Sequence, residues 1–177
     1  LIKEGKIRRE PLGIVYSILP FDFPPVLTAL QGDIPDMFGN DEFIRPSGQT
    51  INTANFFSEL VEKYGMEGFN VVVDTPGKDF IKAAYVASRV RRFGKLGNER
   101  NGTGLIFAGT ETVWNKIKEY TRYFDITAFN GPGNSIAYVD SSVKNVKGAA
   151  ELLAYASFAN GGQYCFSIKT IVVHGDV

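Results

Sequence analysis

The sequence predicts an α/β protein built on a mostly parallel sheet with helices on both faces. Short runs of β-branched and other apolar residues, which are typical of buried strands, recur along the 177-residue chain. Amphipathic stretches with helical spacing separate these runs. With 44% hydrophobic and 13% aromatic residues, the chain can also bury a sizeable core. Strands that alternate with helices in this way form βαβ units, and these units define the predicted fold class.

The first predicted βαβ unit lies near the start of the chain. Residues 11–20 form an apolar, β-branched run between two prolines, which predicts a buried strand. A helix is predicted over residues 26–38, although Gly32 and Pro35 are unfavourable inside a helix. Residues 42–45 then form a short strand, which completes the unit.

The middle of the chain contains the clearest helix. Residues 50–64 carry apolar side chains at helical spacing, and Gly65 suits the left-handed position that ends a helix. A strand is predicted over residues 69–73 and a helix over residues 79–90. Residues 91–104 are polar and rich in glycine, so we expect a loop there.

The alternation of strands and helices continues after this loop. Residues 105–108 are predicted to form a strand, and Thr110 can cap the helix that follows it. Two further short strands are expected at residues 125–128 and 136–139. Between them, residues 131–134 read Gly-Pro-Gly-Asn, which predicts a tight turn.

The last predicted elements flank the only cysteine of the chain. Ser141 or Ser142 is expected to cap a helix that continues to Ala156, and residues 168–174 have the pattern of a strand. Cys165 lies in the connection between this helix and this strand. A thiol in such a connection can be held rigidly.

Composition and charge exclude several classes of function. Nineteen basic and nineteen acidic residues cancel, which argues against binding of nucleic acid or an anionic membrane through overall charge. No apolar stretch approaches bilayer length and the N-terminus lacks a signal-peptide core, so we expect a cytoplasmic protein. One cysteine and one histidine form neither an internal disulfide nor a zinc site, and no metal is expected. Because the sequence opens without methionine, we expect it to be part of a longer protein.

The residue type alone leaves two interpretations of Cys165. Gly161 and Gly162 would let the backbone approach a ligand closely, and a thiolate is a strong nucleophile. Most solitary cysteines, however, are packing residues that behave as small hydrophobic groups. Other parts of the sequence are needed to distinguish a nucleophilic Cys165 from an inert core residue.

Several ordered motifs resemble those of the aldehyde dehydrogenase superfamily. The matching segments are Pro-Leu-Gly at 11–13, Pro-Phe-Asp-Phe-Pro at 20–24, Gly-Asn at 39–40 with Ile-Arg-Pro-Ser at 44–47, Phe-Ala-Gly-Thr at 107–110, and 158–165 with its Gly-Gln-x-Cys element. The resemblance implies a Rossmann-like NAD(P)-binding part over residues 1–130, leading into the start of a catalytic domain over residues 131–177. It further implies a small-molecule aldehyde as substrate and a homo-oligomer formed through segments outside this sequence.

The resemblance gives Cys165 a chemical role. The thiolate would attack the aldehyde, the thiohemiacetal would pass hydride to the nicotinamide, and a thioester would remain. The oxyanion formed in the attack needs hydrogen-bond donors, and the backbone N–H of Cys165 is one candidate. The family places an asparagine amide at the position of Asp22. An ionised aspartate cannot donate, so Asp22 would serve only when protonated; otherwise it is an ordinary loop residue.

A second departure from the family pattern lies at Phe129. Hydrolytic members carry a glutamate there, which activates the water that cleaves the thioester. Without this general base, hydrolysis should be slow, whereas the thiol of coenzyme A needs less help. The Gly-Pro-Gly-Asn run at 131–134 is also similar to the CoA-acylating branch. The alternative interpretation of this run is a simple turn.

The cofactor contacts are also implied by the resemblance. Arg-Pro-Ser-Gly stands where the family has Lys-Pro-Ser-Glu. The missing carboxylate and the presence of Arg45 favour tolerance of the 2′-phosphate of NADP. The alternative role of Arg45 is a strand-end residue paired with a nearby carboxylate. The expected cofactor-binding residues are Leu19, Phe21, Arg45, Ser47, Gly48, Gly109 and Thr110.

Other features leave a different class of function open. The changes at Asp22, Phe129 and Gly48 are compatible with a non-catalytic aldehyde-dehydrogenase-like domain used for binding or assembly. The basic run from Arg89 to Lys95 could meet a phosphate of CoA or NADP, but a solvated surface is the commoner role. For His174 we expect a surface or edge position rather than catalysis.

Overall fold

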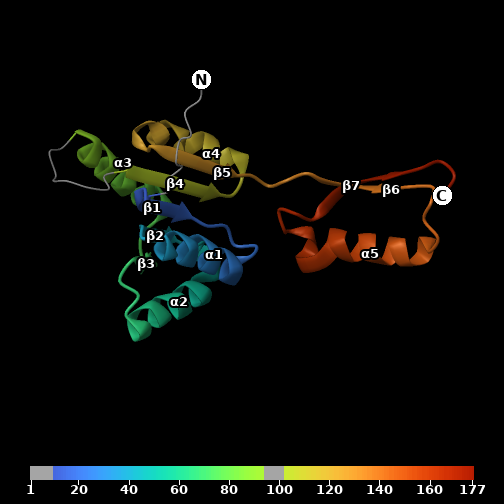
Figure 1. The fold of residues 1–177 in the computed structure, drawn as a ribbon, viewed down its shortest axis with the longest axis horizontal. Coiled ribbons are helices and arrows are strands. Elements are labelled where there is room, and N and C mark those ends of the chain that lie inside the picture. Colours follow the sequence, from blue (N-terminus) through green and yellow to red (C-terminus); the bar gives the residue numbers. More distant parts are fainter. Residues whose placement is uncertain (1–9, 94–101) are drawn as a thin grey trace, which may run out of the picture.

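The computed structural model describes residues 10–93 and 102–177, which form a large sheet with its helices and a smaller unit beside it (Figure 1). The large sheet has five parallel strands in the order β3-β2-β1-β4-β5. These strands are β1 (Gly13–Ile18), β2 (Asp41–Arg45), β3 (Phe69–Val71), β4 (Gly102–Ala108) and β5 (Ile126–Asn130). The order reverses at β1, so the chain first builds the sheet on one side and then on the other. This topology confirms the predicted parallel α/β sheet.

Helices cover both faces of this sheet, as predicted. On one face, α1 (Pro24–Met37) and α2 (Ile51–Tyr64) pack against a core of Leu19, Ile44 and Phe69. On the other face lie α3 (Gly77–Phe93) and α4 (Glu111–Ile117), followed by the 3₁₀ helix η2 (Lys118–Tyr123). The core of this second face is larger and comprises Tyr16, Ile18, Phe80, Ile81, Ala84, Leu105, Phe107 and Phe124.

The smaller unit carries the cysteine. Strands β6 (Ser135–Val139) and β7 (Ile168–Val173) form a two-stranded parallel sheet, and α5 (Val146–Phe158) connects them. The 3₁₀ turn η3 (Ala159–Gly162) follows α5 and leads into the Cys165 segment. A short connection after β5 joins the two units (Figure 1). Among the described helices, none has the length and apolarity needed to span a bilayer.

The predicted glycine-rich loop is shorter than the sequence pattern indicated. α3 continues to Phe93, and β4 begins at Gly102 rather than at Leu105. Both positions in β4 hold glycine because a side chain there would collide with Leu12: a Cβ on Gly102 would lie 2.6 Å from the Leu12 Cδ1 atom, and one on Gly104 would lie 3.0 Å from its Cδ2 atom. Glycine in this strand therefore marks close packing rather than a turn. The remainder of the predicted loop, residues 94–101, lies outside the described residues.

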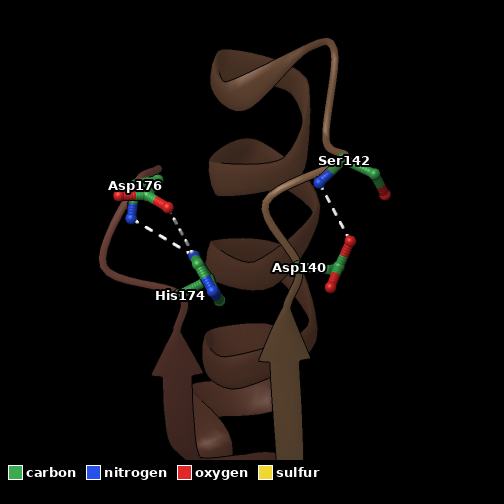
Figure 2. A network of polar contacts seen from close by, with 4 residues as sticks. All are labelled: Asp140, Ser142, His174 and Asp176. Carbon is green, nitrogen blue, oxygen red and sulfur yellow. Dashed lines mark hydrogen bonds and ion pairs between the residues drawn. The ribbon is translucent and has the colours of Figure 1, made fainter.

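Two predictions about helix ends had different outcomes. Thr110 caps α4 as predicted, since its Oγ1 accepts a hydrogen bond from the Val113 N–H. The predicted cap of α5 at Ser141 or Ser142 is wrong. The Asp140 carboxylate accepts a hydrogen bond of 2.9 Å from the Ser142 N–H, which folds this segment into a turn at the end of β6 (Figure 2). The helix then starts later, under the Asn145 side chain.

The proline expected to weaken α1 is inside the helix. Pro35 lies in the last turn, which ends two residues later at Met37. Its carbonyl oxygen accepts a hydrogen bond from the Asn40 side chain, and the Asn40 Oδ1 accepts another from the Gly13 N–H. Asn40 thus ties the end of α1 to the start of β1. These hydrogen bonds stabilise the first βαβ unit, in which the loop after the carboxyl end of β1 forms part of the candidate site.

Candidate active site

A cleft of about 990 Å³ lies where the carboxyl ends of the large sheet meet the cysteine unit. In open α/β sheets, ligands bind beyond the carboxyl ends of the strands. Three segments of the cleft wall follow β1, β4 and β5, and the fourth is the cysteine segment. The lining includes Phe21 and Asp22, Gly109 and Thr110, Phe129 to Gly133, and Gln163 to Phe166 with Lys169.

Cys165 is exposed and lines this cleft. The interpretation as a buried, inert packing residue is therefore wrong. A tight backbone reversal in η3 places the thiol: Asn160, Gly161 and Gly162 all have positive φ, at 53°, 65° and 71°. Such a run is costly for residues with a Cβ, and glycine supplies two of its three positions. The two glycines thus allow the chain to turn sharply from α5 towards the cleft.

Gly133 fixes the other side of the cysteine backbone. It has a φ of 68°, and a Cβ built on it would lie 1.9 Å from the Cys165 carbonyl oxygen. No side chain fits into that space. The Gly-Pro-Gly-Asn run is therefore more than a surface turn, because it packs directly against the main chain of the residue that carries the thiol.

The loop after β1 also contacts the cysteine segment. The Asn160 Nδ2 donates a hydrogen bond of 3.1 Å to the Asp22 carbonyl oxygen. The Phe23 ring meets Tyr164 edge to face, with 5.1 Å between centroids, and also lies 6.0 Å from Phe166. These contacts join the expected catalytic residues Asp22 and Cys165 into one cleft, although they lie 143 positions apart in the sequence.

Asp22 is half-buried and lines the cleft. Its main-chain carbonyl oxygen accepts the hydrogen bond from Asn160, which helps to hold its loop in place. Within the described residues, no hydrogen bond to its carboxylate is found. The side chain is thus available to a ligand.

Phe129 forms an aromatic wall of the cleft. Its ring stacks on Trp114 with 4.9 Å between centroids and 2° between planes, and on Phe107 at 5.8 Å. Trp114 in turn packs against the core. The wall holds no acid or base at this position. Hydrolysis of a thioester would therefore find no general base at Phe129.

The expected cofactor residues fall into two groups. Phe21, Gly109 and Thr110 line the cleft, whereas Leu19 is 3% exposed and packs in the core, so only its backbone could meet a ligand. The second group lies at the end of β2 and just after it, and consists of Arg45, Ser47 and Gly48. Its members do not line the cleft itself but lie at the same carboxyl edge of the sheet.

Among the residues that the structure describes, Arg45 is paired with main-chain carbonyls and not with a carboxylate. Its Nε donates to the Thr75 carbonyl oxygen at 3.1 Å, and its Nη1 donates to that of Pro46 at 2.7 Å. Burial lowers the pKa of Arg45 from its ordinary value. A Cβ on Gly48 would lie 3.9 Å from the Nη2 atom, so Gly48 leaves that side of the guanidinium uncrowded.

The sequence profile of the aldehyde dehydrogenase family matches residues 3–177, nearly the whole chain. The chain belongs to the aldehyde dehydrogenase family. It is 24% identical over 177 residues to malonate-semialdehyde dehydrogenase 2 of Oceanobacillus iheyensis, covering 98% of this chain and 33% of that protein. It is 27% identical to 3,6-anhydro-alpha-L-galactose dehydrogenase of Streptomyces coelicolor, covering 97% of this chain and 32% of that protein.

Solved structures of the family agree with the fold. The gamma-glutamyl-gamma-aminobutyraldehyde dehydrogenase of Burkholderia cenocepacia matches with a TM-score of 0.75 and 25% identity, over 94% of this chain and 32% of that one. This aldehyde dehydrogenase chain thus spans about a third of the length of the curated relatives it matches.

Two polar features of this aldehyde dehydrogenase chain lie outside the cleft. His174 follows β7, and its Nδ1 lies 3.5 Å from an Asp176 carboxylate oxygen (Figure 2). It lies one residue beyond the end of β7, and its side chain is 41% exposed, which confirms the expected surface position. In the basic run, Arg89 lies over the Tyr123 ring on the exposed side of α3, whereas Lys95 lies outside the described residues. Across residues 10–93 and 102–177, no group of three metal-ligating side chains could hold a metal ion.

Sequence reasoning missed one charged residue of the cleft. Lys169, on β7, lines the cleft together with Cys165. A single lysine at the start of a strand carries no pattern that distinguishes it from a solvent-exposed residue. Its position four residues after the cysteine was the one signal that could have indicated it.

Proposed function

We propose that this chain provides the nucleophile and part of the cofactor site of an NAD(P)-dependent aldehyde dehydrogenase. The observation that carries the proposal is the exposed Cys165 thiol in a cleft at the carboxyl edge of a parallel sheet. The thiolate forms a C–S bond to the aldehyde carbon, and the carbonyl oxygen becomes an oxyanion. The Cys165 N–H stabilises this charge. Loss of hydride from the same carbon restores the C=O bond and leaves a thioester.

The residues at this edge fit a nicotinamide dinucleotide, which accepts the hydride when bound. Parallel strands end together here, and the loops after β1 and β4 contribute Phe21, Gly109 and Thr110 to the cleft. The Arg45 guanidinium uses Nε and Nη1 on carbonyls and keeps N–H groups for a further partner. With Gly48 beside it instead of a carboxylate, this end of the site accepts a ribose with or without a 2′-phosphate.

The acyl group is proposed to leave on coenzyme A. The CoA thiolate attacks the thioester carbon, Cys165 departs as a thiolate, and an acyl-CoA is formed. Phe129 supports this route because it gives the cleft an apolar wall without a base to activate water. The reverse sequence reduces an acyl-CoA to an aldehyde.

Mixing the protein with aldehyde, NAD⁺ or NADP⁺ and CoA tests the proposal. We expect CoA-dependent absorbance of the reduced cofactor in the wild type and none in Cys165→Ala, because the variant cannot form the thioester. Arg45→Ala should shift the ratio of activities with NADP⁺ and NAD⁺ towards NAD⁺. Equal rates with and without CoA would argue against the acylating route, since they would show efficient hydrolysis.

The carboxylate at Asp22 and the aromatic ring at Phe129 favour a second candidate, a non-catalytic binding domain. Neither residue supplies the oxyanion donor or the general base that hydrolytic members use. In the same assay, a protein of this kind would bind cofactor but give no signal with any aldehyde, with or without CoA.

A further inference from the structure

Lys169 is an unassigned cationic residue that connects two hollows of the molecule. It lines the Cys165 cleft, and it also lines a second hollow of about 650 Å³ between α5 and β7. Asp22 is the other charged side chain of the cleft lining. The side that carries the thiol therefore has a lysine, whereas the loop after β1 contributes the acid.

One N–H of Lys169 is used to hold the cysteine segment. The Nζ donates a hydrogen bond of 2.7 Å to the Gly162 carbonyl oxygen. Gly162 has a φ of 71°, and a Cβ on it would lie 2.9 Å from the Ser157 carbonyl oxygen. A hydrogen bond from a charged donor is stronger than one between neutral groups. It fixes a carbonyl three residues before Cys165, in the sharp turn that aims the thiol.

The other two N–H groups of the ammonium remain available. Within the described residues, Lys169 has no other hydrogen bond and no ion pair with a carboxylate. An ammonium at the rim of an apolar cleft attracts anions, because field lines concentrate in such a cleft. Phe21, Phe129, Tyr164 and Phe166 supply apolar and aromatic surface around this charge.

We propose that Lys169 both positions the cysteine turn and draws anionic reactants to Cys165. The class of ligand is a reactant that carries a carboxylate or a phosphate close to its electrophilic carbon. This inference rests on the proposed role of Cys165 as the reacting group. Lys169 itself takes no part in bond formation, so it is a positioning and selectivity residue.

Alkylation of the only cysteine measures both effects. Iodoacetate and iodoacetamide have similar size, and in each reaction the thiolate forms a C–S bond while iodide leaves. The first reagent is an anion and the second is neutral. The ratio of their rate constants reports the charge beside Cys165, and the rate with iodoacetamide reports the accessibility and geometry of the thiol.

Three variants separate the hydrogen bond from the charge. Lys169→Arg keeps both, Lys169→Gln keeps a donor for the Gly162 carbonyl without the charge, and Lys169→Met removes both. We expect the iodoacetate-to-iodoacetamide ratio to fall about three- to tenfold in the Gln and Met variants and to be retained in Arg. The iodoacetamide rate should change in Met more than in Gln. In 1 M salt, the ratios of all proteins should converge.

Lys147→Met serves as the matched control, since Lys147 is a solvent-exposed lysine of α5 outside the cleft. An unchanged ratio in Lys169→Gln and Lys169→Met, with a thiol that still reacts, would overturn this inference alone. A wild-type thiol that neither reagent labels until the protein is unfolded would overturn the proposed function, and this inference with it.

Discussion

Glu42 is a fully buried carboxyl group on a central strand of the large sheet. Burial raises its pKa from an ordinary value of 4.5 to about 9, and the nearby Ser17 hydroxyl acts in the opposite direction. Within the described residues, neither carboxyl oxygen has a partner in hydrogen-bonding geometry, so Ser17 offsets little of the lost solvation. The side chain is therefore protonated in the folded protein at neutral pH.

This proton makes folding stability depend on pH. Between pH 4.5 and about 9, the folded state holds a proton that the unfolded chain has released. The contribution of Glu42 is fully present below pH 4.5 and is lost as the pH rises through about 9, at up to about 1.4 kcal/mol per pH unit. Glu42→Gln, which mimics the neutral form, should reduce this slope and be more stable than the wild type at pH 8.

Urea unfolding followed by the fluorescence of Trp114, the single tryptophan, gives the measurement. Glu59→Gln is the control, because Glu59 is an exposed glutamate of α2. Parallel pH profiles for the wild type and Glu42→Gln would contradict the buried, protonated state.

At the scale of elements, α1 packs closely against the sheet because Gly32 has no side chain. A Cβ there would lie 2.3 Å from two ring carbons of Phe69 on β3 and 2.9 Å from the Ile44 Cδ1 atom. Alanine favours a helix by about 1 kcal/mol over glycine. Overpacking a tight interface costs about 1–3 kcal/mol, so the collision outweighs this gain.

Gly32→Ala should therefore lower the free energy of unfolding, although it replaces a poor helix former with the best one. The smaller side chain of Phe69→Leu should restore part of the loss in the double variant, because it makes room for the added methyl group. A double-mutant cycle in urea measures this coupling. Additive effects of the two changes would show that Gly32 and Phe69 do not share the space.

The sequence pattern predicted the elements well where local chemistry alone sets them. Thr110 as a cap and Gly65 as a left-handed helix end depend only on neighbouring residues, and both were found. The predicted cap of α5 was wrong because the Asp140 carboxylate accepts from the Ser142 N–H and folds these residues into a turn, so the helix starts only after Asn145. The early start of β4 was missed because its glycines serve contact with Leu12, a residue 90 positions away.

At the scale of the whole molecule, a few aromatic contacts hold the two units together. Phe23, after β1, packs on Tyr164 and Phe166 of the cysteine segment. Each such pair contributes about 0.5–1.5 kcal/mol beyond its buried area. Phe23→Ala removes both pairs, about 1–3 kcal/mol, and should therefore increase amide hydrogen exchange in residues 158–166 by about five- to 150-fold, while β1 and β4 keep their protection.

Phe56→Ala is the matched control for this exchange experiment. The Phe56 ring is exposed on α2 and contacts Phe57, far in the sequence from the cysteine segment. If residues 158–166 exchange at the same rate in Phe23→Ala and the wild type, then the aromatic contacts do not fix the cysteine segment.

How much of the candidate site could be predicted also depends on distance along the chain. Cys165, Asp22, Gly109 and Thr110 each lie in a motif that can be read locally, and the structure brings them into one cleft. The contact of Gly133 with the Cys165 main chain depends on how two units dock. The position of the Lys169 ammonium at the cleft depends on how β7 begins after the cysteine segment. Neither relation has a signature in residue type or spacing.

The close fit of Gly133 against the Cys165 carbonyl has a mechanical consequence. The connection through which the small unit would have to swing is in contact with the reactive segment itself. The Cys165 main chain therefore lies beside this connection, so a rotation of α5 and its strands about it would displace that main chain only slightly. The residue that carries the thiol is thus attached next to the point about which the two units would turn.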